Sequence, residues 1–386
     1  MLPEKDFDLQ STENVKFLLI AGFADSLLNF RGSLIEKLQS LGLQVHVAAP
    51  AFPKTNAVRR TLEARGVIVH EISVHRTSKN PINELASFFS LWRLMRSVQP
   101  KFVLSYTVKP VIYGSTAAWL CGVPKRFALI TGLGYVFQRR GQRGILLLVV
   151  QWLYTLALKH VHIVFFHNVD DEALFRRRSL VNIRARACVI NGSGVDIAEF
   201  NVVPLPLGPP CFLCIARLLG DKGVREYAEA ARRIRTIYSG VRFLLVGWID
   251  SNPDAIRQYE LDAWVADGTL DFLGRLDDVR PAIALSSVYV LPSYGEGTPR
   301  TVLEAMAMGR AVITTDAPGC RETVVQGDNG LLVPVKSVEA LEQAMLKFVE
   351  DKSLSLRMGK RSRQIAEAKY DVYKVNAVML KEMGIE

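Results

Sequence analysis

Two glutamates and two cationic side chains are spaced in a way that could hold a ligand with both phosphate and hydroxyl groups. Glu296 and Glu304 lie eight positions apart in YGEGTPRTVLEAMAMGRAVITT. Their carboxylates can accept hydrogen bonds from hydroxyls. Arg217 and Lys222 lie five positions apart in CFLCIARLLGDKGV, so a guanidinium fork and a mobile ammonium could reach one diphosphate. Together, the two pairs indicate a site for a nucleotide sugar.

The glutamates lie where a strand passes through a loop into a helix. Residues 288–293 form a short apolar run that predicts a buried strand, and Gly295, Gly297 and Pro299 then interrupt it. VLEAMAM predicts a helix, for which we expect Thr298 as the cap and Pro299 in the first position. The amides at the start of such a helix attract a phosphate.

The basic pair occupies a similar junction. Residues 212–217 predict a strand, Gly220 and Asp221 a tight turn, and Lys222 and Gly223 the opening of a helix. Taken alone, an arginine and a lysine beside a turn are usually solvated. The pair carries more weight here because the glutamate motif follows it within the span of one domain.

With these motifs the chain resembles the family 4 glycosyltransferases of the GT-B architecture, over essentially its whole length. The resemblance implies that Arg217 and Lys222 bind the donor diphosphate, and that Glu296 and Glu304 contact the donor sugar and the ribose. Residues 105–137 resemble enzymes that build lipid-linked oligosaccharides. The nearest likeness is to bacterial N-acetylgalactosaminyltransferases of N-glycosylation and to related enzymes of O-antigen, lipopolysaccharide and capsule assembly. Other family-like segments are 21–50, 166–175, 192–200 and 327–334.

The resemblance extends the expected donor site to several backbone positions. Gly22 precedes a helix after the first strand, where family members approach the donor phosphates. The motif lacks the G-x-G-x-x-G of dinucleotide-binding enzymes, which argues against a nicotinamide cofactor. Residues 273–279 stand where family members contact the nucleobase, although Asp277 and Asp278 could equally form a solvated turn. The further expected donor contacts are Gly274, Leu276, Gly297, Thr298, Pro299 and Arg300.

One departure from the family concerns the acceptor side. Many relatives carry His–Gly at the end of a strand of the first domain, whereas this chain has Thr131 and Gly132 in ITGLG. A catalytic histidine is therefore not carried over. Thr131, Gly132 and Lys109 are the candidates for contacts with the acceptor.

Strands and helices alternate along the chain, which predicts an α/β fold with doubly wound parallel sheets. The GT-B resemblance implies two Rossmann-like domains facing a cleft in which substrate would lie. We expect an acceptor-binding domain over 1–200 and a donor-binding domain over 211–366. The prolines of 201–210 predict a linker. By resemblance, a helix over 367–386 packs back on the first domain.

The excess of positive over negative charge lies in the first half of the chain, which suggests an anionic partner. Residues 1–200 hold 25 lysines and arginines against 14 aspartates and glutamates, and the net charge of the chain is +10. No nucleic-acid-binding signature is recognisable. An anionic membrane surface or a lipid-diphosphate acceptor accounts better for the charge.

A second membrane signal is the apolar run over 145–158, which follows Arg139, Arg140 and Arg143. At about 14 residues the run is too short to span a bilayer, which takes about 20. It could lie in the membrane interface or be a buried helix of the first domain. The polar first residues show no signal peptide, so we expect a cytoplasmic protein at the inner face of the cell membrane.

Cysteine and histidine patterns do not indicate a metal. Cys211 and Cys214 form a C-x-x-C, but positions three apart on a strand point to opposite faces, so they are interpreted as packing thiols. The histidines at 160, 162 and 167 lack a carboxylate or cysteine at ligand spacing. We therefore expect a metal-independent donor site without a cofactor.

The motifs and the resemblance together predict a glycosyltransferase that moves a hexosamine or hexose from a UDP-sugar to a polyprenyl-diphosphate-linked saccharide. The resemblance implies that the transfer retains the anomeric configuration. One alternative is a nucleotide-sugar 2-epimerase of the same architecture, which would not need the paired R-x4-K and E-x7-E motifs. The other alternative is a non-catalytic module that senses a nucleotide sugar.

Overall fold

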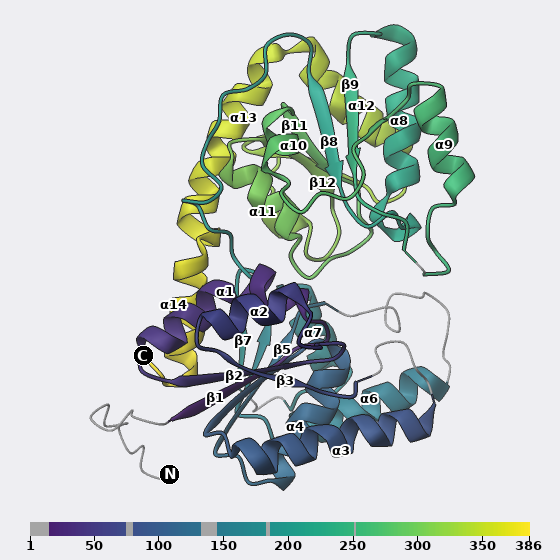
Figure 1. The fold of residues 1–386 in the computed structure, drawn as a ribbon. Helices are drawn as coiled ribbons and strands as arrows, with labels where there is room; N and C mark the ends of the chain where they lie inside the picture. The colour runs from purple at the N-terminus through teal and green to yellow at the C-terminus, as the bar shows by residue number, and fades with distance from the viewer. Residues whose placement is uncertain (1–14, 75–79, 133–144, 183–185, 251) are drawn as a thin grey trace. The chain divides into compact units, whose positions relative to one another are not determined.

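The computed structural model describes residues 15–74, 80–132, 145–182, 186–250 and 252–386, and the chain divides into two compact units (Figure 1). Unit 1 comprises Met1–Ile190 and Val375–Glu386, and unit 2 comprises Asn191–Lys374. Each unit contains one sheet whose strand pairs are all parallel. The predicted α/β class is confirmed.

The sheet of unit 1 has the order β3-β2-β1-β4-β5-β6-β7, and helices cover both of its faces. Along β1, Phe17 and Leu19 pack in one buried cluster and Leu18 in another, which is why the strand is a continuous apolar run. The strands are β1 (Lys16–Ile20), β2 (Gln44–Ala49), β3 (Ile68–Glu71), β4 (Phe102–Tyr106), β5 (Lys125–Ile130), β6 (Ile163–Phe166) and β7 (Arg186–Val189). The helices are α1 (Asp25–Ser40), α2 (Ala57–Ala64), α3 (Pro81–Val98), the π-helix η2 (Pro110–Gly114), α4 (Ser115–Leu120), α6 (Ile145–Leu158), α7 (Val169–Arg177) and α14 (Val372–Met383).

The sheet of unit 2 has the order β10-β9-β8-β11-β12-β13. Cys211 and Cys214 both lie on β8 and are buried in different clusters, on opposite faces of the sheet, which confirms their interpretation as packing thiols. The strands are β8 (Cys211–Ile215), β9 (Arg242–Val246), β10 (Asp271–Phe272), β11 (Val288–Leu291), β12 (Ala311–Thr315) and β13 (Gly330–Val333). The helices are η3 (Gly220–Lys222), α8 (Val224–Ile237), α9 (Gln258–Ala266), α10 (Arg280–Ala284), α11 (Arg300–Ala307), η4 (Arg321–Thr323), α12 (Val338–Glu350), α13 (Lys352–Ile365) and η5 (Ala366–Tyr370).

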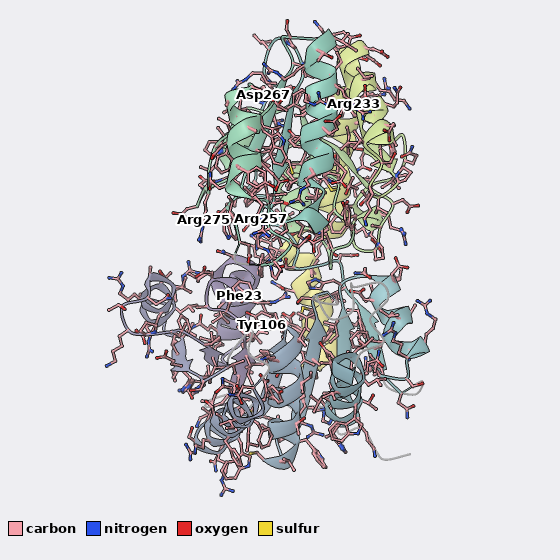
Figure 2. All side chains as sticks on the ribbon, turned by 90° about the vertical axis from the view of Figure 1, so that its right-hand side faces the viewer. Phe23, Tyr106, Arg233, Arg257, Asp267 and Arg275 are labelled. Carbon is pink, nitrogen blue, oxygen red and sulfur yellow. The ribbon has the colours of Figure 1, made fainter. Side chains whose placement is uncertain are left out.

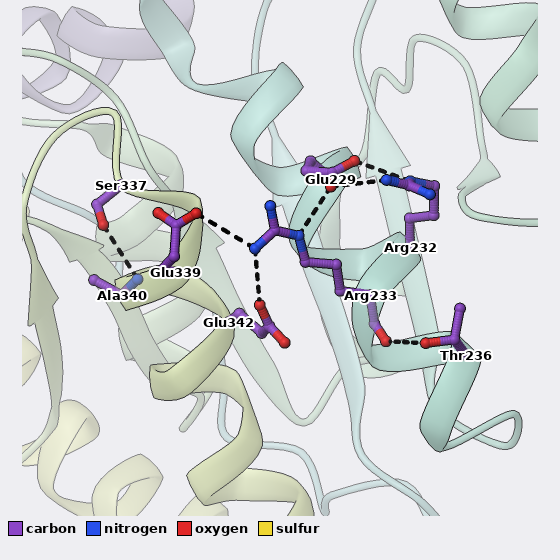
Figure 3. A network of polar contacts seen from close by, with 8 residues as sticks. All are labelled: Glu229, Arg232, Arg233, Thr236, Ser337, Glu339, Ala340 and Glu342. Atoms are coloured by element: carbon purple, nitrogen blue, oxygen red, sulfur yellow. Dashed lines mark hydrogen bonds and ion pairs between the residues drawn. The ribbon is translucent and has the colours of Figure 1, made fainter.

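A charged network joins two of the outer helices of unit 2 (Figure 3). Arg233 of α8 donates to Glu229 on its own helix at 2.9 Å, and reaches Glu342 and Glu339 of α12 at 3.3 and 3.4 Å. These side chains are exposed to solvent, which screens the ion pairs, so they add little to stability. The apolar contacts beneath them, including Tyr227 and Met345, hold the two helices on the sheet.

The polypeptide passes between the units twice, and the two passages are linked within unit 2. Val195 donates to the carbonyl of Tyr370 at 2.8 Å, and Val372 donates back to Val195 at 3.0 Å. Gly194 has φ +69°, and a Cβ there would lie 2.6 Å from the Cα of Val372. Only glycine permits this approach of the two segments.

Arg310 is a buried cation that holds irregular backbone to unit 2. It is fully buried, and burial lowers its pKa to about 10. Its guanidinium donates to carbonyls within the stretch 201–210, within α10 and just after α11, namely those of Val203, Pro204, Ile283, Ala284 and Met308. The proline-bearing stretch is therefore tied to unit 2.

Replacing Arg310 with methionine should destabilise unit 2 by about 3 kcal/mol or more, because several buried carbonyls lose their donor. Urea unfolding followed by circular dichroism would measure this. Arg361→Met removes an exposed arginine of the same unit, paired with Asp328, and should change stability by less than about 1 kcal/mol. Equal losses in the two variants would contradict the assignment.

Candidate active site

Unit 2 places the predicted site residues where its strand order reverses. The order turns back between β8 and β11, and ligands of doubly wound sheets bind at such a point, beyond the carboxyl ends of the strands. Arg217 and Lys222 follow β8, and Glu296 follows β11. The sheet therefore brings together two motifs separated by more than seventy residues.

Direct contacts join the two loops. The carbonyl of Asp221 accepts from the amide of Tyr294 at 2.8 Å and from the hydroxyl of Ser293 at 3.2 Å. Gly223 has φ +72°, and a Cβ there would lie 2.2 Å from the carbonyl oxygen of Pro292. The loops can meet this closely only with glycine at position 223.

The contact between the loops brings Lys222 and Glu296 together. The Lys222 Nζ lies 2.6 Å from Glu296 Oε1, and the two side chains are 13% and 19% exposed. Partial burial strengthens this interaction relative to a surface ion pair. The structure thus joins one member of the basic pair to one member of the glutamate pair.

Arg217 has a carboxylate partner that the motif did not predict. Its Nη1 lies 3.1 Å from Oδ2 of Asp250, which follows β9. The amide of Asn252 donates to the other oxygen of Asp250 at 2.9 Å. Because Asp250 lies 33 positions from Arg217, no local spacing signals the pair.

Asp221 adds a further carboxylate between the two cations. Burial raises its pKa, Lys222 opposes that shift, and Glu296 and Asp254 reinforce it. The amide of Asp221 donates to Asp254 at 2.9 Å. Asp221 and Asp254 therefore add two more carboxylates to the region around the two cations.

The second glutamate, Glu304, is buried on α11. Arg300, at the first position of this helix, donates to Glu304 at 2.8 Å one turn later. Glu304 is 8% exposed, and burial raises its pKa against the opposing effect of Arg300. A carboxylate oriented in this way can accept a hydrogen bond from a bound hydroxyl.

The cap expected for α11 was wrong by one residue. Pro299, and not Thr298, is the N-cap, and the helix begins at Arg300. The Thr298 hydroxyl donates to the carbonyl of Gly297 at 2.9 Å, and its side chain packs against Gly192. Pro299 keeps its extended backbone conformation and has no amide hydrogen to satisfy.

A third loop supports Glu296 from the side of β12. The Glu296 amide donates to the carbonyl of Pro318 at 2.9 Å. Gly319 has φ +78°, and a Cβ there would lie 2.1 Å from the Glu296 carbonyl oxygen. No local sequence pattern signals this role of Gly319, because its close contact with Glu296 appears only in the fold.

The segment expected near a nucleobase lies after β10. Gly274 accepts a hydrogen bond from Gly247 at 2.9 Å, and Leu276 packs at the edge of a buried cluster. Asp277 and Asp278 are exposed, and Asp278 pairs with Arg280 at 2.8 Å. Arg275, labelled in Figure 2, stacks over the Trp248 ring at 5.0 Å.

Unit 1 holds the remaining candidates, beginning with Gly22 after β1. A Cβ at Gly22 would lie 2.3 Å from the Thr107 hydroxyl, so the loops after β1 and β4 are in close contact. Beside them, the Tyr106 hydroxyl is 2.9 Å from Ser26, whose hydroxyl donates to the Phe23 carbonyl at 2.6 Å (Figure 2). These bonds position the loop that carries Gly22.

Lys109, Thr131 and Gly132 lie beyond the carboxyl ends of the adjacent strands β4 and β5. Lys109 pairs with Glu84 of α3 at 2.6 Å, and the Tyr113 hydroxyl donates to the same carboxylate at 2.7 Å. Thr131 and Gly132 are half-buried. The three residues share one edge of the unit 1 sheet.

A cavity of about 580 Å³ opens at the carboxyl ends of β1, β2 and β3. In the part of the chain that the structure describes, its wall includes Gly22 and Asn56, and the charged side chains are the carboxylates of Asp25 and Glu71. Carboxylate and amide oxygens can accept hydrogen bonds from the hydroxyls of a ligand. Among the described residues, no group of three or more His, Cys, Asp or Glu is placed to hold a metal ion.

Comparisons with known proteins identify the family. Residues 209–351 match the family described as "Glycosyl transferases group 1", and residues 18–168 match "Glycosyl transferase 4-like". The N,N'-diacetylbacillosaminyl-diphospho-undecaprenol alpha-1,3-N-acetylgalactosaminyltransferase of Campylobacter jejuni is 31% identical, over 91% of this chain and 93% of its own. The chain belongs to the group 1 glycosyltransferases.

Other relatives of this glycosyltransferase agree. The Escherichia coli UDP-Gal:alpha-D-GlcNAc-diphosphoundecaprenol alpha-1,3-galactosyltransferase is 26% identical, over 73% of this chain and 74% of its own. Sucrose-phosphate synthase of Thermosynechococcus elongatus shares the fold, with a TM-score of 0.78 at 18% identity over 95% and 98% of the two chains. Anabaena HepE in complex with UDP has a TM-score of 0.72 at 18% identity over the same shares. The GT-B architecture is confirmed, and the 2-epimerase alternative finds no support among these proteins.

Gly319→Ala should lower the transfer rate of the enzyme by on the order of 100-fold, because the new Cβ displaces the peptide of Glu296. Gly327→Ala is the matched control, since Gly327 also has positive φ but has no atom within 4 Å of an added Cβ. Initial rates of both folded variants would be compared. Similar rates for the two would show that Gly319 does not position Glu296.

Proposed function

We propose that the enzyme transfers a hexosamine or hexose from a UDP-sugar to a polyprenyl-diphosphate-linked saccharide, in the assembly of a cell-surface polysaccharide or glycan. The observation that carries this is the placement of Arg217, Lys222 and Glu296 at the strand-order reversal of unit 2. Cations for a diphosphate and a carboxylate for a sugar lie within one set of touching loops.

The chemistry of the acceptor is inferred from the relatives. The printed names of the Campylobacter and Escherichia relatives both specify a saccharide on a diphospho-undecaprenol carrier, and the second names UDP-Gal as donor. Identity of 31% over nearly the full chain supports the same substrate class here. The identity of the transferred sugar depends on individual side chains, which can differ between proteins that share 31% of their residues.

In the proposed reaction, the bond from the anomeric carbon to the UDP oxygen breaks and a bond to the acceptor hydroxyl forms on the same face. The acceptor proton passes to the departing diphosphate. Arg217 and Lys222 stabilise the negative charge that develops on the diphosphate. Glu296 orients the sugar and stabilises its positive charge, and Glu304 holds ribose through its buried, Arg300-oriented carboxylate.

The two domains have separate roles in this proposal. The second domain, 211–366, binds the donor, with Gly274 and Leu276 near the base and Gly297 to Arg300 near the phosphates. The first, 1–200, binds the acceptor through Lys109, Thr131, Gly132 and the cavity beside Asp25, and its Gly22 loop approaches the donor phosphates. No metal is required for this assignment.

Glu296→Gln should reduce turnover by on the order of 100-fold while the fold survives, because transition-state charge stabilisation is lost. Glu339→Gln changes an exposed glutamate of the same unit and should leave turnover unchanged. Steady-state rates at saturating donor would be measured for both. A fully active Glu296→Gln enzyme would remove this residue from the mechanism.

The donor and acceptor can be tested together by measuring UDP release from a panel of UDP-sugars, with and without bacterial lipid extract. We expect release with one sugar, dependent on the lipid. Conversion of a UDP-sugar without acceptor would indicate an isomerase. Saturable UDP binding without release in any condition would indicate a sensor.

We further propose that unit 1 binds an anionic membrane surface at the cytoplasmic face. Within the described residues, no helix is both long and apolar enough to cross a bilayer. Helix α6 buries Tyr154 and Leu158 but exposes Leu148 and Trp152, each at 64%. One face of this helix is therefore buried in unit 1, and the opposite face is the one that we propose to lie in the membrane interface.

Helix α3 exposes a second apolar stripe, which a basic stripe continues. Ile82, Leu85 and Phe89 are exposed, and Arg93 and Arg96 follow on the same side. Both α3 and α6 pack on η2. Apolar and basic side chains on a helix face suit the interface of an anionic bilayer.

The predicted cluster of Arg139, Arg140 and Arg143 lies outside the described residues. The five cysteines are free thiols, which suits the reducing compartment expected for a cytoplasmic location.

Leu85→Glu with Phe89→Glu, or Leu148→Glu with Trp152→Glu, should lower binding to phosphatidylglycerol-containing vesicles on the order of tenfold or more. Tyr259→Glu with Val265→Glu changes exposed apolar residues of α9 in unit 2 and should have no effect. Cosedimentation would measure the bound fraction. Undiminished binding of both unit 1 variants would contradict the assignment.

A further inference from the structure

Both cations assigned to the donor diphosphate contact carboxylates of the protein itself. Lys222 lies 2.6 Å from Glu296, and Arg217 lies 3.1 Å from Asp250. A diphosphate oxygen and a carboxylate oxygen are similar acceptors, and both prefer the same positions around a guanidinium or an ammonium. The protein thus directs two acidic side chains at the groups that an anionic ligand would use.

The surroundings intensify this competition. The carboxylate of Asp221 lies in the same loop as the two cations, and one of its oxygens is buried with no hydrogen-bond partner among the described residues. Asp254 receives the Asp221 amide at 2.9 Å. Four carboxylates therefore surround two cations, and a diphosphate that enters this region meets acidic groups as well as basic ones.

We propose that the donor diphosphate displaces Asp250 from Arg217 and Glu296 from Lys222, and that Asp250 thereby sets the affinity for the nucleotide. The inference rests on the proposed donor site. Displacement costs little at Asp250, whose side chain is 22% exposed and can turn to water. At Glu296 the displaced carboxylate turns to the sugar, so the diphosphate that occupies Lys222 also frees the group that assists its departure.

The proposed competition predicts that removing Asp250 changes UDP affinity in the opposite direction from removing a residue that only binds the donor. A residue that only binds donor weakens binding when it is removed. Removal of Asp250 should instead strengthen UDP binding, because Arg217 loses a competitor and the phosphates lose a repelling charge. Asparagine at 250 retains the oxygen that accepts from the amide of Asn252, so the loop keeps its turn.

The test is isothermal titration of UDP and of uridine into the full chain and three variants. Asp250→Asn should bind UDP about three- to fivefold more tightly, as expected for loss of a partly exposed ion pair, with uridine unchanged. Glu296→Gln should also bind UDP more tightly although its turnover falls. Asp328→Asn is the matched control, since it removes another Arg–Asp pair of unit 2, at 2.7 Å, and should leave UDP affinity unchanged.

The outcomes separate this inference from the proposed function. Weaker or unchanged UDP binding in Asp250→Asn would overturn the inference. If Arg217→Ala and Lys222→Ala nevertheless abolished UDP binding, the proposed donor site would be supported even though the competition by Asp250 was not. Absence of UDP binding to the unaltered protein would overturn both. Tighter binding of uridine as well as UDP in Asp250→Asn would show a general change in the loop, and would also overturn the inference.

Discussion

The hydrogen bonds between the loops after β8 and β11 fix the geometry on which the proposed donor site depends. The Asp221 carbonyl accepts from Tyr294 and Ser293, and Gly223 allows its backbone to lie against Pro292. Parallel strands deliver both loops to one edge of the sheet, but strand pairing alone would leave their tips free. These contacts convert two flexible connections into one surface, from which Lys222 and Glu296 project at fixed separation.

The site depends equally on keeping charges balanced in a partly buried place. Each of the two cations proposed to bind the diphosphate, Arg217 and Lys222, has a carboxylate partner, and Arg300 pairs with the buried Glu304. An unpaired charge at the depth of Glu304, which is 8% exposed, would cost several kcal/mol, and the pair with Arg300 avoids that cost. The same pairs make binding an exchange of partners, since a ligand must replace the interactions that it disrupts.

The sequence predicted those parts of the enzyme that depend on local patterns. Apolar runs such as 212–217 and 288–293 identified buried strands, because a sheet covered on both faces leaves no polar face to alternate. Strand β7 has no such run to identify it, since Arg186–Val189 is a short, half-exposed edge strand. Asp250 and the role of Gly319 were missed because their contacts join positions that only the folded sheet brings together. Thr298 was misassigned because a capping residue and a proline compete for adjacent positions.

The helix over 145–158 shows a different limit of sequence reasoning. Its composition is apolar all round, so the pattern could not show which side is buried, and the two readings were posed as alternatives. In the fold, Tyr154 and Leu158 pack inside unit 1 while Leu148 and Trp152 face outward. The sequence pattern indicates how apolar the helix is. Which side is buried depends on its packing against η2 and α4.

The paired passages of the chain between the units have a consequence for its covalent integrity. Because the segment at Val195 is hydrogen-bonded to Tyr370 and Val372, the polypeptide enters and leaves unit 2 as a two-stranded strap. A single backbone cut in either passage would leave both halves joined through the other one. New termini could therefore be introduced there, as in a circular permutant, with the native pairing of β-strands and the sequence from Arg217 to Glu304, which carries the proposed donor site, left uninterrupted.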